Sequence, residues 1–252
     1  MCLILIAHQF SKERPLVVLA NRDEFYQRPT AAAGPWQECP EMIAGRDLAS
    51  GGTWFGVRGR RWAGVTNVRE GFQQGHSSHS RGWLVRDYLL GQDAAPKYLA
   101  KIAGDADQYA GFNLLLGDGD TLWFGSNRGP TAKQLSPGLY GLSNHQLDTP
   151  WPKVRRGKAA LRALLTGPSF TIEDAFAILT DTTQASDAEL PDTGVPQAWE
   201  RALSAAFIDF DDYGTRSSTV LIKTAAGTYH FIERSYNGSP RHGQEKVLTW
   251  RA

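Results

Sequence analysis

The sequence predicts an α+β fold, built as one layered domain over residues 1–252. Strand-like runs open the chain, amphipathic helical segments fill its middle, and strand-like runs return in the closing third. No internal repeat, low-complexity tract or linker interrupts this order. A chain of 252 residues is long enough to bury a full core, so we expect a single domain.

The composition excludes several classes of partner. With a formal net charge of +1, the chain has no general attraction for nucleic acid or acidic membranes. No apolar stretch approaches the roughly 20 residues that span a bilayer, and the first apolar run lacks the features of a secretory signal. Two cysteines, Cys2 and Cys39, fit a reducing compartment. We expect a cytoplasmic protein with a small-molecule substrate or ligand, no nucleic-acid partner, no membrane span and an undetermined oligomeric state.

A hairpin is expected at the start of the chain. The apolar run 2–7 and the run 15–20 are separated by a polar turn, which is typical of two antiparallel strands. Four polar residues, 21–24, follow the second run directly. Antiparallel pairing would bring them alongside Cys2, where an acid could orient its amine or thiol.

The remaining pattern alternates between hairpins and helices. Residues 26–50 are rich in Ala, Gly and Pro, without a sustained period, and are predicted to form a long covering loop. The further strands are expected at 51–58, 61–67, 112–116, 121–124, 138–144, 219–222, 229–233 and 246–248. The helices are expected at 81–90, after the N-cap Ser80, and at 95–102, 151–165, 172–179 and 198–207.

Cys2 is an unusual way to begin a buried strand. If the initiator Met1 is removed, Cys2 carries both a thiol, with a pKa of about 8.5, and an α-amine, with a pKa of about 8. The amine could then accept the thiol proton, which is the arrangement of an N-terminal nucleophile. The alternative is a retained Met1 with Cys2 as a small buried hydrophobe, and the two residues alone do not decide between them.

Seven motifs, in order along the chain, carry a family resemblance. They lie at 21–24 (NRDE), 51–54 (GGTW), 64–67 (GVTN), 80–82 (SRG), 111–113 (GFN), 141–144 (GLSN) and 213–218 (YGTRSS). In these the chain resembles the NRDE family, also called the transport and Golgi organisation protein 2 family. That family is similar to the cysteine-type N-terminal-nucleophile hydrolases, namely the choloylglycine hydrolases and penicillin V acylases. The resemblance implies a four-layer αββα sandwich and cleavage of amides other than the peptide backbone.

The resemblance also implies a set of catalytic residues. It places the nucleophile at Cys2 and the acid that holds it at Asp23. It places the two oxyanion-binding amides at Asn67 and Asn144, and a late arginine near the nucleophile at Arg216. Taken singly, each Asn could equally be a turn residue.

Substrate contacts are expected beside these residues. The resemblance gives the acid either Asn21 or Arg22 as its neighbour, depending on a one-residue shift in the alignment. Trp54 could line an aromatic pocket, although core packing is the commoner fate of such side chains. The acylases carry an arginine three residues before the acid, where this chain has Ala20. Whether Arg22 takes over that role is left open.

Two functions follow from these features. The first is an amidohydrolase that cleaves a linear, non-peptide amide of a small, partly apolar substrate through a thioester, without a cofactor or metal. The His76 and His79 pair is too weak a signal for a metal site. The alternative is a non-catalytic carrier of haem or lipid on the same fold, with His8, His145 or Cys2 as candidate axial ligands.

Overall fold

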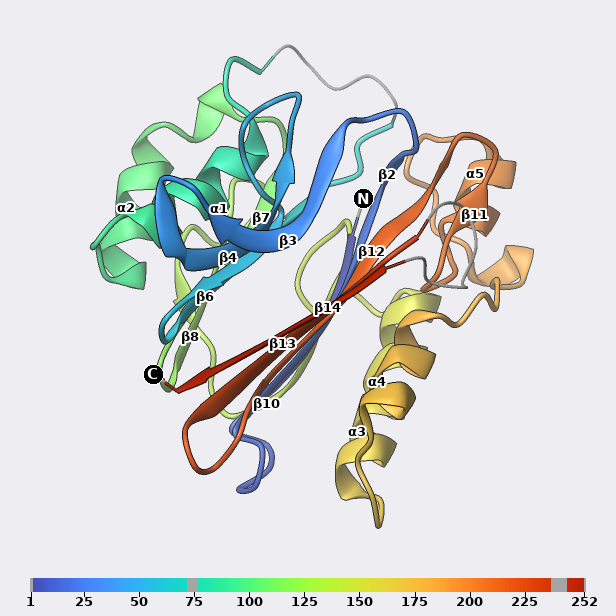
Figure 1. Ribbon diagram of the computed structural model, residues 1–252. Coiled ribbons are helices and arrows are strands. Elements are labelled where there is room, and N and C mark those ends of the chain that lie inside the picture. The colour runs from blue at the N-terminus through green and yellow to red at the C-terminus, as the bar shows by residue number, and fades with distance from the viewer. Residues whose placement is uncertain (1, 72–76, 237–243, 252) are drawn as a thin grey trace. The chain divides into compact units, whose positions relative to one another are not determined.

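The computed structural model describes residues 2–71, 77–236 and 244–251, which divide into two compact units. Unit 1 is formed by residues 2–27, 137–143 and 147–251, and unit 2 by residues 28–136 and 144–146. Each unit contains one antiparallel sheet (Figure 1). The expectation of a single domain remains a prediction.

In the sheet of unit 1, the chain's first strand lies between two others, second from one edge. The strand order of the sheet is β10-β1-β2-β12-β13-β14, with the short strand β11 paired to β12. The strands are β1 (Cys2–His8), β2 (Leu16–Phe25), β10 (Gly138–Leu142), β11 (Asp209–Phe210), β12 (Tyr213–Lys223), β13 (Thr228–Ser235) and β14 (Gln244–Arg251). The apolar residues of β1 and β2 are nearly all buried.

Helices cover one side of this sheet. Helices α3 (Pro152–Thr166) and α4 (Ile172–Leu179) pack on it (Figure 1), and η2 (Asp187–Glu189) and α5 (Gln197–Ala202) follow along the chain. Their apolar faces form a core with alternate residues of the strands, such as Leu3, Leu5 and Val220. We call this side of the sheet the helix-facing side. The approach is close, because a Cβ added at Gly157 of α3 would lie 2.6 Å from Leu5 Cδ1.

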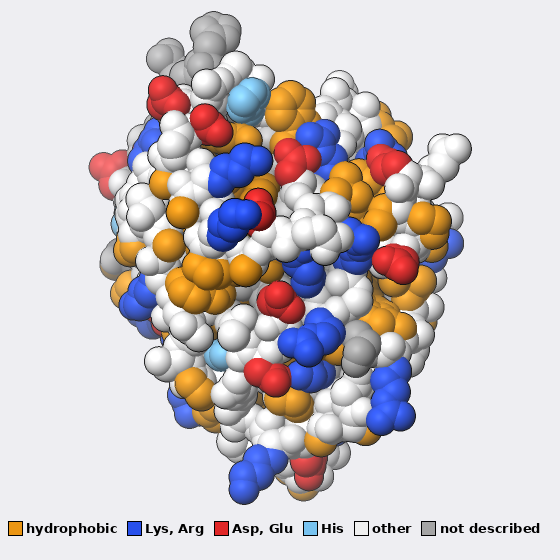
Figure 2. Space-filling model, turned by 90° about the vertical axis from the view of Figure 1, so that its left-hand side faces the viewer, with side chains coloured by type: hydrophobic (Ala, Val, Ile, Leu, Met, Phe, Trp, Pro, Cys, Tyr) orange, Lys and Arg blue, Asp and Glu red, His pale blue; other side chains and the backbone are white. Residues whose placement is uncertain are grey.

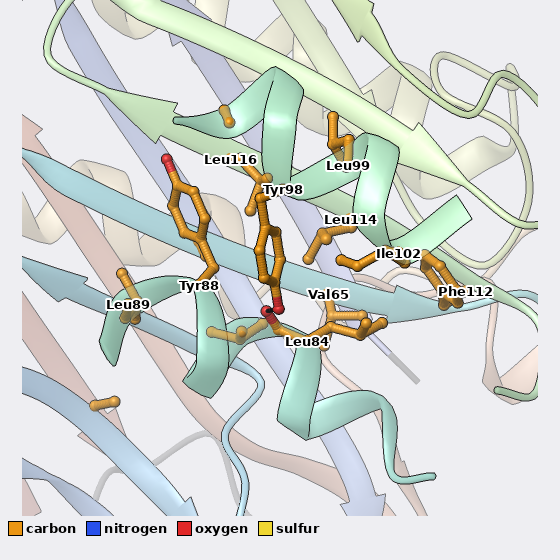
Figure 3. Close-up of a cluster of buried hydrophobic side chains, with 14 of the residues drawn as sticks. Val65, Leu84, Tyr88, Leu89, Tyr98, Leu99, Ile102, Phe112, Leu114 and Leu116 are labelled. Carbon is orange, nitrogen blue, oxygen red and sulfur yellow. Dashed lines mark hydrogen bonds between the residues drawn. The ribbon is translucent and has the colours of Figure 1, made fainter. Parts of the chain in front are cut away.

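The sheet of unit 2 is a meander in which every strand pairs with its neighbour in the sequence. Its strands are β3 (Thr30–Trp36), β4 (Cys39–Asp47), β5 (Phe55–Arg58), β6 (Arg61–Asn67), β7 (Phe112–Asp118), β8 (Thr121–Ser126) and β9 (Lys133–Gln134). Helices α1 (Arg81–Leu90) and α2 (Ala95–Gly104) and the turn η1 (Ala106–Gln108) complete the unit. The core between the helices and this sheet is apolar (Figure 3), and its buried Tyr98 hydroxyl donates to the Leu84 carbonyl at 2.8 Å.

Most expected elements are confirmed, although several bounds differ. The strand expected over 51–58 begins at Phe55, and the one expected over 219–222 begins at Tyr213. The loop predicted over 26–50 is wrong, since β3 and β4 form a hairpin there; alternate residues such as Trp36, Met42 and Ala44 are buried against α1 and α2, a tertiary effect that the Ala- and Gly-rich sequence conceals. Strand β2 runs through 21–24 instead of ending before it. The helix expected over 198–207 ends at Ala202.

The α+β class is confirmed, because each unit combines an antiparallel sheet with helices on it. Among the described residues, no helix is both long and apolar enough to span a membrane. On the face shown in Figure 2, Lys and Arg side chains are interspersed with Asp and Glu, in keeping with the net charge of +1.

Candidate functional site

Cys2 lies directly opposite Arg22 in the pairing of β1 with β2. Residues opposite each other in an antiparallel pair share a side of the sheet, with Cβ atoms about 5 Å apart. The next pair, Leu3 and Asn21, points to the helix-facing side, so Cys2 and Arg22 point to the opposite side. Ala20 is opposite Ile4, two residues further along β1. Arg22 is therefore closer to the thiol along the strands than an arginine at position 20 would be.

A β-bulge brings Arg216 to the same side. The register of β12 against β2 shifts between Thr215 and Ser217, so that Arg216 is the extra residue opposite Arg22. Arg216 Nη1 donates to the Phe25 carbonyl at 2.9 Å. Burial lowers the pKa of Arg216, and the positive charge of Arg22 acts in the same direction. Two guanidinium groups near the thiol favour binding of a negative charge there.

Asp23 lies on the helix-facing side and is 1% exposed. Its Oδ1 accepts a hydrogen bond from Thr215 Oγ1 at 2.8 Å, and its backbone carbonyl accepts one from the Tyr213 hydroxyl at 2.9 Å. Burial raises the pKa of Asp23, and the strongest opposing influence is the positive charge of Lys153. The carboxyl group is thus fixed in place, and its charge depends on neighbouring cations.

The Cys2 thiol is not activated by its surroundings alone. Burial raises its pKa, and the negative charge of Asp23 acts in the same direction. The positive charge of the chain's amino terminus is the largest opposing influence, and the backbone N–H of Asp23 and the charge of Arg22 also lower the pKa, although the net shift is upward. The carbonyl of Cys2 accepts a hydrogen bond from Ser143 Oγ at 3.2 Å, which holds the start of β1. A thiolate at this position therefore requires a base, which the α-amine of Cys2 could provide once Met1 is removed.

Asn21 has a structural role on the helix-facing side. Its Nδ2 donates to the carbonyls of Leu179 and Ala206, at 2.8 Å each, and its Oδ1 accepts from Ser218 Oγ at 2.5 Å. These bonds tie the end of α4 and the segment after α5 to the sheet. A substrate contact for Asn21 remains only a prediction.

In unit 2, the structure brings Asn67 and Asn144 together. Asn67 is the last residue of β6. Asn144 Nδ2 donates to the backbone oxygen of Asn67 at 3.1 Å and to Asn67 Oδ1 at 2.9 Å. Asn144 is buried, and its carbonyl accepts from the Arg69 N–H at 2.8 Å. Because Asn67 turns its amide oxygen to Asn144, its NH2 group is oriented toward other acceptors. The Asn67 NH2 group is thus a hydrogen-bond donor whose orientation is fixed by Asn144.

The aromatic residues of unit 2 divide between two environments. Phe55 and Trp62 are each 2% exposed, with ring centroids 5.8 Å apart, so they belong to the interior. Trp54 is partly exposed, and its ring covers Gly45, where an added Cβ would lie 2.1 Å from Trp54 Cη2. The substrate contact expected for Trp54 remains a prediction.

Two of the motifs pack against each other, and their close backbone contact requires glycine. An added Cβ at Gly52 would lie 2.5 Å from the backbone carbon of Gly82, and the Thr53 N–H donates to the Gly82 carbonyl at 3.1 Å. The motif at 51–54 and the motif at 80–82 thus join the loop before β5 to the first turn of α1. Their role is close backbone packing.

Lys153 is a residue that the sequence analysis missed. It is 1% exposed, in the first turn of α3, and its charge acts on Asp23. One signal was present in the sequence: a lysine directly after the N-terminal Pro152 of a helix is disfavoured by the helix dipole. The electrostatic influence of Lys153 on Asp23 depends on tertiary packing.

The histidine pair gives no metal site in the described chain. His79 lies against the rings of Trp83 and Tyr109, at centroid distances of 5.3 and 5.2 Å, and His76 lies outside the described residues. Within 2–71, 77–236 and 244–251, no group of three His, Cys, Asp or Glu side chains could hold a metal ion.

Known proteins resemble the chain over nearly its whole length. The family model described as Transport and Golgi organisation 2 matches residues 1–238. The bovine Transport and Golgi organization protein 2 homolog is 36% identical over 242 residues, covering 89% of this chain and 87% of the relative. The human homolog is 34% identical, covering 87% and 86% of the two chains, and the Drosophila melanogaster protein is 27% identical, covering 91% and 89%.

A solved structure shares the fold at low sequence identity. It is the Caenorhabditis elegans N-acylethanolamine-hydrolyzing acid amidase ortholog, with a TM-score of 0.50 and 11% identity, covering 88% of this chain and 92% of that chain. At this identity the likeness shows the fold alone. The expected relation to the N-terminal-nucleophile hydrolase fold is thereby confirmed.

Proposed function

This chain belongs to the Transport and Golgi organisation 2 family, and we propose that it is an N-terminal cysteine amidohydrolase acting on a linear, non-peptide amide of a small, partly apolar substrate. One observation supports this most strongly: Cys2 begins an inner strand directly opposite Arg22, with Arg216 bulged toward the same side and Asp23 buried next to that pair. Nothing about a stable sheet requires these four polar residues at one strand end.

The proposed reaction uses the two groups of Cys2 in turn. After Met1 is removed, the α-amine takes the thiol proton, and the sulfur attacks the amide carbon of the substrate. The C–N bond breaks as the proton passes to the leaving nitrogen, which gives a thioester on Cys2. Water, losing a proton to the same amine, then attacks the thioester, releases the acid and restores the thiol.

The other residues take supporting roles in this proposal. Asp23 accepts a hydrogen bond from the amine and fixes its position, while Arg22 and Arg216 offer positive charge on the side of the sulfur. The resemblance assigns the oxyanion to both Asn67 and Asn144. Because Asn144 Nδ2 donates to Asn67 Oδ1, we give Asn67 the direct contact with the oxyanion and Asn144 the role of orienting it. Trp54 remains the candidate for the apolar part of the substrate.

The test compares two forms of the full chain, one with a free α-amine on Cys2 and one in which that amine is blocked. In the first, the mass of the N-terminal peptide verifies that the chain starts at Cys2; in the second, an N-terminal tag keeps that amine in a peptide bond. Both are assayed against a panel of acyl amides that includes N-acylethanolamines. Hydrolysis by the processed form alone, abolished by Cys2→Ala, is expected.

Thiol reactivity gives a second measurement that needs no substrate. In the tagged form we expect slow alkylation by iodoacetamide with a midpoint above the ordinary thiol value, because burial raises the pKa of Cys2. In the processed form alkylation should be fast and should fall below a pH of about 7, where the amine is protonated. Equal rates in both forms, or full retention of Met1 in the native host, would count against the proposal.

The haem-carrier alternative has less support from the geometry. Cys2 and His8 stand at opposite ends of β1, about 20 Å apart at 3.3 Å per residue, so they cannot ligate one haem iron. His145 is exposed, and its backbone carbonyl accepts from Asn113 Nδ2 at 2.8 Å. A carrier role predicts ligand binding that survives Cys2→Ala without turnover.

A further inference from the structure

The ammonium group of Lys153 is buried, and a buried ammonium group is expected to be paired with an anion. The side chain is 1% exposed, and lysine is almost never fully buried unless it is paired. It also lies in the first turn of α3, where the positive end of the helix dipole repels a cation. An anion on the facing surface of the sheet would offset both costs.

The packing of α3 directs Lys153 to the helix-facing side. Lys153 and Gly157 are four residues apart and therefore share a face of the helix, and Gly157 packs on Leu5 of β1. The adjacent Val154 packs in the same way on Gly141 of β10. The first turn of α3 therefore lies on the side of the sheet that carries the Asp23 carboxyl group.

We propose that Lys153 is a positioning residue for the N-terminal nucleophile: it pairs with Asp23 beneath the start of β1 and keeps that carboxylate ionised, so that Asp23 can hold the amine of Cys2. The inference rests on the proposed function for its catalytic consequence, whereas the charge pair itself can be tested without turnover.

The electrostatics around Asp23 support this role. The charged and hydrogen-bonding groups that act on the Asp23 carboxyl group are Lys153 from α3, the positive amino terminus of the chain and Thr215 from β12. Arg22 and Cys2 also act on its charge, although their side chains lie on the other side of the sheet. Burial raises the pKa of Asp23, and Lys153 provides the largest opposing influence. Loss of that ammonium should raise the pKa of Asp23 further, and a neutral carboxyl group would accept poorly from an ammonium.

The first experiment measures the ionisation of Asp23 directly. The full chain, labelled with carbon-13 at aspartate carboxyl groups, is titrated by NMR, and the Asp23 resonance is assigned from its loss in Asp23→Asn. The midpoint should rise by about one pH unit or more in Lys153→Met and return toward the wild-type value in Lys153→Arg. Lys158→Met is the matched control, because Lys158 sits on the same helix but pairs at the surface with Asp148 at 2.6 Å.

The second experiment asks whether Lys153 acts through Asp23. Alkylation of Cys2 by iodoacetamide is followed against pH in the processed form of the wild type, Lys153→Met, Asp23→Asn and the double variant. Lys153→Met should slow the reaction at neutral pH roughly tenfold or more, yet make no further difference in the Asp23→Asn background. If Lys153→Met alone fails to fold, Lys153→Gln replaces it in the comparison with the wild type, and the charge-free double variant is still compared with Asp23→Asn.

The outcomes separate the two proposals. An Asp23 midpoint unchanged by Lys153→Met, or an equal slowing in the Asp23→Asn background, overturns the role of Lys153 whether or not any amide is cleaved. A shifted midpoint and a non-additive effect on alkylation, without hydrolysis of any amide, would support the charge pair and remove the enzymatic proposal.

Discussion

The helix-covered sides of the two sheets differ at one place. In unit 2, the helices α1 and α2 meet the sheet through apolar residues, and the buried hydroxyls of Tyr88 and Tyr98 reach backbone carbonyls (Figure 3). In unit 1, the same kind of interface is apolar around Leu5 but becomes polar and charged at the start of β1, where Asp23 and Lys153 are buried.

Under the proposed function, the difference marks the place where burial of charge serves the reaction at a cost in stability. Burying a charge costs several kcal/mol even when it is paired, whereas an apolar contact of the same volume stabilises. In unit 2 the charged groups at this interface are Arg58 and Arg61, which donate to backbone carbonyls at and after the end of α1. Under the proposed function, the buried Asp23 and Lys153 of unit 1 serve Cys2.

The largest expected effect comes from breaking the charge pair. Lys153→Met leaves Asp23 buried without its main counter-charge and should lower the free energy of unfolding by about 3 to 5 kcal/mol. The double variant with Asp23→Asn should lose less than the single one. Urea unfolding of the two variants, with Lys158→Met as a surface control expected to cost about 0 to 1 kcal/mol, measures this. A double variant less stable than Lys153→Met would contradict the pairing.

The next effect concerns the polar pair of unit 2. Under the proposed function, Asn67→Ala removes an oxyanion donor and should reduce kcat by about 10² to 10³. Asn144→Ala should reduce it less, because its amide acts by orienting Asn67. Steady-state kinetics of the processed form, with the folded state verified by circular dichroism, checks the order. A larger loss for Asn144→Ala would reverse these two roles.

A smaller effect is expected in the apolar interface. Tyr98→Phe removes the donor to the buried Leu84 carbonyl and should cost about 1 to 3 kcal/mol in unfolding free energy. Tyr88→Phe is the matched control, since its hydroxyl is 3.4 Å from the Gly117 carbonyl and should matter less. Neither substitution should alter the alkylation rate of Cys2. A changed rate would contradict the view that this apolar interface has no effect on Cys2.

The smallest expected effect is a slope of stability with pH. The folded-state pKa of Asp23 lies above its ordinary value of 3.8, so the folded state holds this proton more tightly than the unfolded state. Its contribution to stability is full below 3.8 and is lost as the pH rises through the folded-state value, with a slope of at most about 1.4 kcal/mol per pH unit. Urea unfolding across pH should show this slope in the wild type and not in Asp23→Asn. If the stability of the wild type relative to Asp23→Asn rose with pH, the sign of the prediction would be wrong.

The sequence predicted the parts of the site that depend on local pairing. The hairpin turn at 11–14 implied that residues 20–24 return to Cys2, and the register of Cys2 with Arg22 confirms it. It did not reveal the bulge at Arg216, because one extra residue in a strand leaves no mark in the apolar pattern. The hairpin of β3 and β4 was missed for a related reason: its small residues become strand through packing under helices that come later in the chain.

By itself, the sequence determined the α+β class, the family, and a cysteine at the start of a buried strand, because these depend on periodicity and on motifs that are contiguous in the chain. Only the tertiary structure decided which polar residues share a side of the sheet with that cysteine and which lie beneath it. Arg22 and Arg216 share its side, whereas Asp23 and Lys153 are buried on the other. The physical reason is that strand register, a bulge and helix packing bring together residues that are far apart in the chain, such as Arg22 with Arg216.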